Sequence, residues 1–310
     1  VMGTAMAGIA TIAYTQEALT GASHKKVGPR FIPKILGNIA AANIAIDYNI
    51  QGPSFTVSTA CSSGGDAINT ACMCMQSGKA DIMLAVGAES VLCPLVIYSL
   101  ANAKALSRRN DSPSTASRPF DVTRDGFVIG EGGGALVLET EEHALARGAK
   151  IYAEIRGCGN TDDAYHVTAP HPEGRGAIAC MKQAIAEAGI NPSDIGYINA
   201  HGTATNKGDT VEASSIKKVF GNTLPYVSST KGATGHMMGA GGITETITCV
   251  KAIETGTVPP TINLNEVDPE CAGIDFVANT AKKAEINFAM SNAFGFGGQN
   301  SSIIVGKYGK

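Results

Sequence analysis

The sequence predicts an α/β fold in which helices alternate with strands that pair mostly in parallel. Short β-rich runs recur along the chain, and segments with apolar residues at helical spacing lie between them. The 310 residues are 44% hydrophobic and 16% charged, a balance that allows a large buried core. The 37 glycines follow no collagen-like period and indicate many tight turns.

Five runs carry the strand signal, and three segments carry the helical signal. Their apolar and β-branched composition predicts strands at 55–59, 82–86, 135–138, 151–155 and 195–199. Helices are expected over 67–75, over 176–188 and from 242 onward. In the second of these, apolar residues repeat every three or four positions up to Gly189, a residue suited to a helix C-cap.

Two glycine-rich segments resemble hairpins, and each closes a series of alternating elements. One runs from Gly126 to Leu138, and the other runs from Ala289 to Val305. This repetition predicts an internally duplicated chain whose halves meet near residue 150. No low-complexity linker separates the halves in the sequence, so we expect 1–150 and 151–310 to share one packed body.

Composition excludes several classes of protein. A net charge of −3 argues against a nucleic-acid-binding protein, and no run approaches the ~18 apolar residues of a membrane span. The eight cysteines are sparse for a disulfide scaffold, which favours a reducing compartment, so we expect a cytoplasmic protein. Cys72 and Cys74 lack a second pair at zinc-like spacing, so no metal is expected.

Cys61 is the strongest candidate for a nucleophile. It follows an apolar strand and precedes a helical segment, which is the arrangement of a nucleophile elbow. The N-terminus of that helix would point at the sulfur, lower the pKa of the thiol and favour the thiolate. A buried structural cysteine is the alternative interpretation of the same residues.

Two histidines also follow strand-like runs, in loops rich in Gly and Thr. His201 comes directly after the strand at 195–199, and His236 follows the run that begins at Val227. Because active sites of α/β sheets gather at the carboxyl ends of strands, both are candidates for the same site. Their spacing matches no standard zinc motif. The glycines at 130–134 do not lead from a strand into a helix, so a dinucleotide site is not expected.

Together these segments resemble the Cys-His-His β-ketoacyl-acyl-carrier-protein synthases, most closely the bacterial type II enzyme that elongates fatty acids. The resemblance runs in order along the chain through TACSS (59–63), SRPFD (117–121), RDGFV (124–128), DAYH (163–166), NAHGT (199–203), KGATGH (231–236) and NAFGFGG (292–298). It implies a thiolase-like duplicated fold in five layers, α-β-α-β-α. About a hundred residues of the family precede the position that matches Val1, so the first half is expected to be truncated.

The resemblance implies a decarboxylative Claisen condensation that extends an acyl chain by two carbons. Cys61 would carry the acyl group as a thioester, and His201 and His236 would donate hydrogen bonds to the enolate oxygen of the malonyl substrate. Backbone N–H groups of Cys61 and Phe296 would form the oxyanion hole, and Phe296 would also act as a gate. No cofactor is implied, because both substrates arrive on the phosphopantetheine of an acyl carrier protein.

Other positions are assigned supporting roles by the same resemblance. Lys231, paired with Glu212, would bias protonation in the site, although a plain structural ion pair explains them equally well. Thr203 and Thr205 would hydrogen-bond the pantetheine arm, or else only stabilise their loop. Because carrier proteins are acidic, a basic docking surface is expected, along with a homodimer. The positions that match the docking residues of the family are Lys25, Lys26 and Lys104.

Several relatives of this family remain as alternatives. A polyketide ketosynthase shares the Cys-His-His set, and a truncated, non-catalytic fragment of the family would share the sequence as well. A degradative thiolase is disfavoured because the loop at 292–298 holds no second cysteine. A coenzyme-A-using initiating synthase would carry Asn where this chain has His236, and an inactive chain-length factor would lack Cys61.

Overall fold

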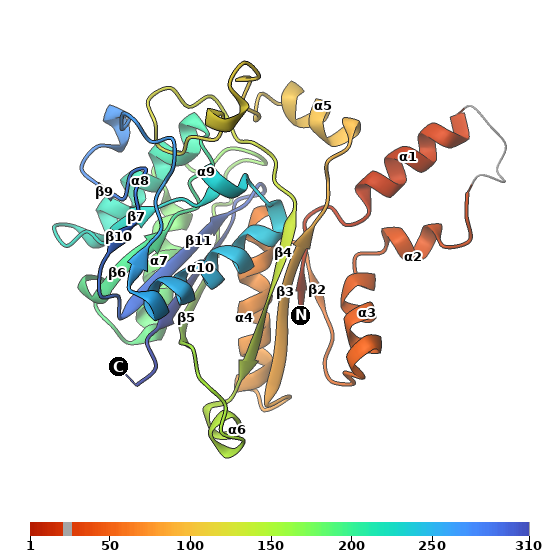
Figure 1. The fold of residues 1–310 in the computed structure, drawn as a ribbon, viewed down its shortest axis with the longest axis horizontal. Helices are drawn as coiled ribbons and strands as arrows, with labels where there is room; N and C mark the ends of the chain where they lie inside the picture. Colours follow the sequence, from red (N-terminus) through yellow and green to blue (C-terminus); the bar gives the residue numbers. More distant parts are fainter. Residues whose placement is uncertain (21–26, 310) are drawn as a thin grey trace.

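Two mixed β-sheets, one from each half of the chain, form the framework of the computed structural model, which describes residues 1–20 and 27–309 (Figure 1). Helices lie between the two sheets and against both of their outer faces (Figure 1). The layers therefore follow one another in the order α-β-α-β-α. The predicted α/β class and its layered arrangement are confirmed.

The first sheet has four strands in the order β2-β1-β3-β4. The short strand β1 (Met2–Gly3) lies parallel between β2 (Thr56–Val57) and β3 (Ile82–Glu89). Strand β4 (Gly132–Glu139) runs antiparallel to β3 along its full length. Because β2 ends just before Cys61, the carboxyl edge of this sheet faces the candidate site.

The second sheet has six strands in the order β5-β12-β11-β6-β7-β9. The first three pair antiparallel, and the last three join β11 in parallel. A separate two-stranded ladder pairs β8 with β10. The bounds of these strands are β5 (Glu154–Asp162), β6 (Ile195–Asn199), β7 (Tyr226–Ser228), β8 (Thr257–Val258), β9 (Asp275–Phe276), β10 (Lys282–Lys283), β11 (Phe288–Phe294) and β12 (Gln299–Gly306).

The central layer between the sheets consists of α4 (Ser63–Gln76) and α10 (Gly241–Thr255), which contact strands of both sheets. Helices α7 (Arg175–Ala188) and α8 (Asn206–Phe220) cover the second sheet on its outer side. The remaining α-helices are α1 (Ile9–Thr20), α2 (Phe31–Ile35), α3 (Ile39–Tyr48), α5 (Pro94–Asn102), α6 (Glu141–Ala146) and α9 (Lys231–Thr234). Within the described part of the chain, no helix has the length and hydropathy needed to cross a membrane.

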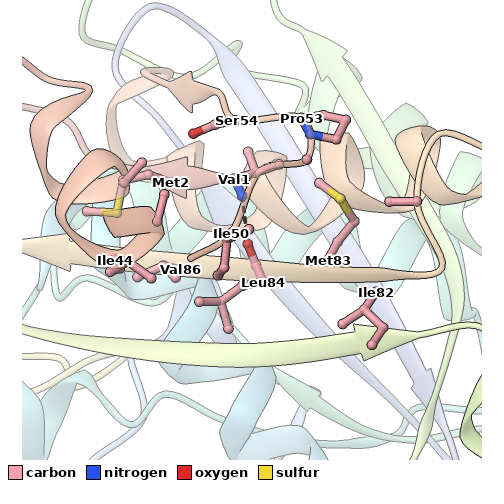
Figure 2. Close-up of a pocket in the computed structure, with 14 residues that line it drawn as sticks. Val1, Met2, Ile44, Ile50, Pro53, Ser54, Ile82, Met83, Leu84 and Val86 are labelled. Carbon is pink, nitrogen blue, oxygen red and sulfur yellow. Dashed lines mark hydrogen bonds between the residues drawn. The ribbon is translucent and has the colours of Figure 1, made fainter. Parts of the chain in front are cut away.

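The outer face of the first sheet packs against α3 and encloses a small apolar pocket, which Figure 2 shows in close-up. Ile44 reaches the pocket from α3, while Leu84 and Val86 reach it from β3 (Figure 2). The α-amino group of Val1 donates a hydrogen bond of 2.6 Å to the backbone oxygen of Leu84.

Most of the sequence-based elements are present. Strand β6 has the predicted bounds, α7 begins one residue earlier than predicted, and β11 and β12 form the expected hairpin. The strand predicted at 151–155 is displaced, because β5 begins only at Glu154 and continues to Asp162. Its polar second half is ordered by pairing with β12, a contact that residue composition does not reveal.

The hairpin predicted from Gly126 to Leu138 is wrong. Strand β4 pairs with β3 instead, and the residues before it make single bridges, such as Phe127 with Leu106. A Cβ on Gly126 would lie 2.5 Å from the carbonyl carbon of Leu106, and the φ of this glycine is 138°. The glycine therefore serves a close backbone approach and not a hairpin turn.

Candidate active site

Three reactive side chains from distant parts of the chain meet at the carboxyl edges of the two sheets. Cys61 lies in the short 3-10 helix Ala60–Ser62 before α4, His201 follows β6, and His236 follows α9. The Cys61 sulfur and one ring nitrogen of each histidine all lie within 4.8 Å of one another. Nε2 of His236 is 3.0 Å from Sγ of Cys61, and the two imidazole rings meet edge to face. A nucleophile and two hydrogen-bonding imidazoles thus share one small volume.

The turn that carries Cys61 is held by its own small side chains. Ala60 adopts a positive φ of 50°, and the Ser63 hydroxyl bridges this turn by accepting from the Thr59 N–H and donating to the Ala60 oxygen. The Phe296 backbone N–H donates a hydrogen bond to the Cys61 sulfur. A Cβ on Gly295 would lie 2.8 Å from the Thr59 oxygen, so only glycine lets this loop approach the turn so closely.

Glu212 of α8 positions the loop that carries His201. Its carboxylate accepts the backbone N–H of His201 at 2.8 Å and that of Gly202 at 2.7 Å. Asn292 of β11 also donates to this carboxylate, at 3.4 Å. Burial raises the pKa of Glu212 to about 7, against the lowering effect of these backbone donors. The carboxylate therefore acts through the backbone of the histidine loop.

The segment before β4 positions His236. The His236 N–H donates to the Val128 oxygen at 2.7 Å, and the Gly130 N–H donates to the His236 oxygen at 2.9 Å. The Phe127 ring meets the imidazole edge to face, with 5.2 Å between ring centres. The stretch that the sequence predicts as a hairpin arm is thus a backbone clamp on a histidine. The match of this stretch to the family motif RDGFV was the sequence signal that could have indicated its place at the site.

Lys231 forms a buried ion pair, but its partner is not the predicted one. Its ammonium group bonds the carboxylate of Glu245 on α10, and both side chains are almost fully buried. The predicted Lys231–Glu212 pair is wrong, because Glu212 is engaged by backbone N–H groups of the His201 loop. A carboxylate fourteen residues away is reached only because α9 and α10 fold back on each other around the site.

The charge states of the site follow from burial. Burial raises the pKa of the Cys61 thiol to about 11, although the Phe296 N–H and the Lys231 charge oppose it. The expected lowering of this pKa at the helix N-terminus is therefore wrong, because removing a thiolate from water outweighs those donors. Burial and the nearby Lys231 charge lower the pKa of His201 and of His236 well below 6.5. At neutral pH a protonated thiol lies beside two neutral imidazoles.

The other predicted residues lie at varying distances from this centre. Thr203 and Thr205 share a hydrogen bond of 3.1 Å in the loop that follows His201. The Phe296 side chain is 39% exposed, so its ring lies at the mouth of the site while its N–H reaches the sulfur. Lys104 is exposed at the end of α5. The remaining docking predictions, Lys25 and Lys26, fall outside the described residues.

Two buried carboxylates near the site were missed from the sequence. Asp66 of α4 accepts from the Thr59 and Ser62 hydroxyls and, at 2.7 Å, from Nδ2 of Asn160 on β5. Glu245 is the partner of Lys231. Each is an acidic residue inside otherwise apolar helical text, and buried charges of that kind need partners. The sequence therefore could have indicated two buried, partnered carboxylates, but it could not identify their partners.

The arrangement supports nucleophilic chemistry at a thiol together with stabilisation of negative charge. The imidazoles of His201 and His236 are neutral, so each can donate one N–H to an oxygen that gains charge. The Phe296 backbone N–H is a further donor beside the sulfur. Among residues 1–20 and 27–309, the Cys61, His201 and His236 group is also the one whose spacing could hold a metal ion.

Comparisons with known proteins agree along the chain. The description "Beta-ketoacyl synthase, N-terminal domain" matches residues 1–144, and "Beta-ketoacyl synthase, C-terminal domain" matches residues 152–265. The chain is 45% identical to 3-oxoacyl-[acyl-carrier-protein] synthase 2 of Rhizobium meliloti, covering 99% of this chain and 73% of that protein. The enzyme of the same name from Coxiella burnetii is also 45% identical, with 99% and 74% covered.

Solved structures share the fold. A ketosynthase in complex with its type II PKS acyl-carrier protein, and bound to the hexaketide, superposes with a TM-score of 0.92 at 36% identity, covering 99% of this chain and 78% of that one. A β-ketoacyl synthase from Burkholderia phymatum also gives a TM-score of 0.92, at 35% identity, with 99% and 74% covered. The two-sheet arrangement described above is therefore that of solved ketosynthases.

Proposed function

The chain belongs to the β-ketoacyl synthase family, and on that premise we propose that it is an elongating 3-oxoacyl-[acyl-carrier-protein] synthase of fatty acid biosynthesis. It is an acyltransferase that joins an acyl group to a malonyl unit, releases carbon dioxide and lengthens the chain by two carbons. One observation carries the catalytic assignment. Cys61, His201 and His236, which lie far apart in the sequence, bring their reactive atoms within 4.8 Å of one another.

The first half-reaction transfers the acyl group to Cys61. Nε2 of His236 lies 3.0 Å from the sulfur, so it accepts the thiol proton as the sulfur attacks the acyl thioester. The oxyanion that forms is stabilised by the Cys61 and Phe296 backbone N–H groups. Collapse of the intermediate expels the pantetheine thiolate, which takes the proton back from His236. The products are acyl-Cys61 and free carrier protein.

The second half-reaction forms the new carbon–carbon bond. The malonyl thioester loses its carboxylate as carbon dioxide, and the electron pair of the broken bond becomes an enolate. The neutral His201 and His236 donate hydrogen bonds to the thioester oxygen that gains this charge, which lowers the barrier by about 3 to 4 kcal/mol for each well-placed donor. The enolate carbon attacks the acyl-Cys61 carbonyl, the Cys61 thiolate leaves, and it takes up one proton from solvent to regenerate the thiol.

The substrates are carried by an acidic acyl carrier protein, and the enzyme needs no cofactor of its own in this scheme. Thr203 and Thr205 are assigned to the pantetheine arm, and Lys104 with Lys25 and Lys26 to the carrier surface. We also propose a homodimer. Exposed apolar side chains support it, because large apolar side chains are costly to leave in water. They include Leu92, Leu95 and Tyr98 near α5 and Ile46 and Tyr48 on α3.

The test is an intact-mass assay with a medium-chain acyl-carrier protein. We expect one acyl adduct, and peptide mapping should place it on Cys61. Cys61→Ala should carry no adduct, whereas His201→Ala should acylate but lose most malonyl decarboxylation. A folded wild-type chain that takes no acyl group, or equal loss of both half-reactions in His201→Ala, would contradict the assigned roles.

A polyketide-type ketosynthase is the second candidate. The observation behind it is the structural likeness to a ketosynthase bound to the hexaketide. The product distinguishes the two, because an elongating synthase releases a 3-oxoacyl chain after one condensation. Incubation with acyl- and malonyl-carrier protein, without reductases, should yield a product two carbons longer. A series of poly-β-keto products from repeated condensation would favour the second candidate.

A further inference from the structure

A buried carboxylate connects the turn that carries Cys61 to the second half of the fold. Asp66 lies in the first turn of α4 and is only 4% exposed. Oδ2 of its carboxylate accepts the Thr59 hydroxyl at 2.5 Å and the Ser62 hydroxyl at 3.1 Å. Oδ1 accepts a side-chain N–H of Asn160 on β5 at 2.7 Å. One carboxylate oxygen therefore holds a residue before Cys61 and a residue after it, while the other oxygen bonds β5.

The far end of this connection is fixed in the second sheet. Asn160 pairs with Ser301 of β12 along the strand ladder, and its backbone N–H donates to Oε1 of Gln183 on α7 at 3.3 Å. Helix α4 belongs to the first half of the chain and β5 to the second, and the two elements contact each other (Figure 1). The bond between Asp66 and Asn160 thus joins the nucleophile turn to a strand that is held by its own neighbours.

The nucleophile turn is strained, so contacts with its surroundings must hold it. Ala60 has a φ of 50°, and a residue with a side chain keeps such a conformation only where the neighbouring structure fixes it. A Cβ on Gly65 would lie 2.4 Å from Oγ of Ser301, so the start of α4 also packs closely on β12. Because His201 and His236 belong to the second half, these contacts also set the distance from the nucleophilic sulfur to the two imidazoles.

We propose that Asp66, through its bond to Asn160, is a positioning residue that holds the Cys61 sulfur in place for acyl transfer. This inference rests on the proposed transfer of an acyl group to Cys61. Asp66 keeps the turn at a fixed distance from His236, whose Nε2 lies 3.0 Å from the sulfur and accepts the thiol proton. A shift of about 1 Å in a reacting group can slow a reaction by about 10²-fold, so even a small movement of this turn slows acylation.

The two half-reactions respond differently to a displaced turn. Acylation needs the sulfur beside Nε2 of His236, whereas malonyl decarboxylation uses the N–H donors of His201 and His236 and does not use the sulfur. A loss of folded protein would instead lower both rates by the same factor. The ratio of the acylation rate to the decarboxylation rate therefore distinguishes a positioning role of Asp66 from a purely stabilising one.

The test exchanges the two partners. Asn160→Asp replaces the amide donor with a carboxylate, which has no hydrogen to donate to Asp66. Acylation by a medium-chain acyl-carrier protein should slow by at least about tenfold, while malonyl decarboxylation stays close to the wild-type rate. Asn160→Ala removes the donor without adding a charge and should separate the two rates in the same way. In Asp66→Asn/Asn160→Asp, the new amide keeps an oxygen for the two hydroxyls and donates to the new carboxylate, so acylation should recover.

Alkylation of Cys61 by iodoacetamide is a readout that does not depend on the proposed function. Cys61 is partly exposed, and fragmentation of tryptic peptide 35–79 locates the adduct. The alkylation rate should fall in Asn160→Asp and recover in the double variant, because a displaced sulfur loses contact with the base at His236. A wild-type chain that is alkylated at Cys61 but takes no acyl group would refute the proposed function, and alkylation would still test the positioning role.

Asn191→Asp is the matched control. Asn191 is exposed like Asn160, and it lies in the turn before β6, at the end of that strand opposite His201. This variant adds the same charge and should keep all three wild-type rates. Wild-type acylation and alkylation in Asn160→Asp, or a double variant that restores neither, would overturn the proposal. An equal loss of acylation and decarboxylation in Asn160→Asp would overturn it as well, because it indicates a purely stabilising role.

Discussion

The buried ion pair between Lys231 and Glu245 contributes to stability, and its Lys231 charge lowers the pKa of the two histidines. A double variant can separate these two effects. Both side chains are almost fully buried, and the second oxygen of Glu245 has no hydrogen-bond partner within the described residues. Removing one partner leaves the other charge buried and uncompensated, which typically costs about 3 to 5 kcal/mol. Lys231→Met should therefore lose that much free energy of unfolding at pH 7.5. Replacing both residues with apolar ones of similar volume should recover most of it.

The loss in Lys231→Met should also depend on pH. Burial already raises the pKa of Glu245, and removing the Lys231 charge raises it further. A carboxyl group whose pKa is raised by folding contributes stability at low pH and loses it as pH rises through the folded value. The single variant should therefore approach the wild type in acid. Urea titrations of the wild type, Lys231→Met and Lys231→Met/Glu245→Leu at several pH values measure this.

The effect of the Lys231 charge on the two histidines should remain absent in the double variant, even though its stability is restored. The Lys231 charge lowers the pKa of His201 and His236, so both values should rise in the double variant, and NMR titration of the ring protons can follow them. The acid limb of malonyl decarboxylation should move to higher pH with them. A double variant as unstable as Lys231→Met, or histidine titrations unchanged from the wild type, would refute this reasoning.

Three further predictions concern the supports of the two histidines. Glu212→Gln leaves one backbone N–H of the His201 loop facing the amide N–H of the new side chain. The free energy of unfolding should therefore fall by about 1 to 3 kcal/mol, and malonyl decarboxylation should slow. Urea unfolding curves that match the wild type would contradict this. Because folding lowers the pKa of His201 and His236, the stability that these neutral imidazoles contribute is complete above pH 6.5 and is lost as pH falls. The urea midpoint of the wild type should therefore drop between pH 7 and 5, and it should drop less in His236→Asn. A urea midpoint that does not change with pH would count against buried neutral imidazoles. Gly130→Ala places a Cβ 2.4 Å from the backbone oxygen of Thr234, the last residue of α9, so His236 should shift and decarboxylation should fall. Gly52→Ala is the control, because nothing lies within 4 Å of its added Cβ, and equal rates in the two variants would exclude the proposed clamp.

The sequence predicted a structural feature correctly wherever all residues that form the feature lie in one contiguous segment. The turn at Cys61 needs small residues within four positions of itself, and the loop at His201 follows a strand whose bounds are readable from its apolar composition. The same is true of the hairpin of β11 and β12, where both arms and the turn are contiguous. The segment at 126–130 misled the prediction because its partners, Leu106 and His236, lie outside the local window.

The sequence by itself determined the α/β alternation and the family, and it singled out the three residues that the fold brings together at the candidate site. These properties depend on residue periodicity and on contiguous motifs, which survive without knowledge of packing. Only the tertiary structure decided that Lys231 pairs with Glu245 and that burial raises the pKa of Cys61. Ion pairing and desolvation both depend on which surfaces two distant segments bury together, and the packing of the two halves determines those surfaces.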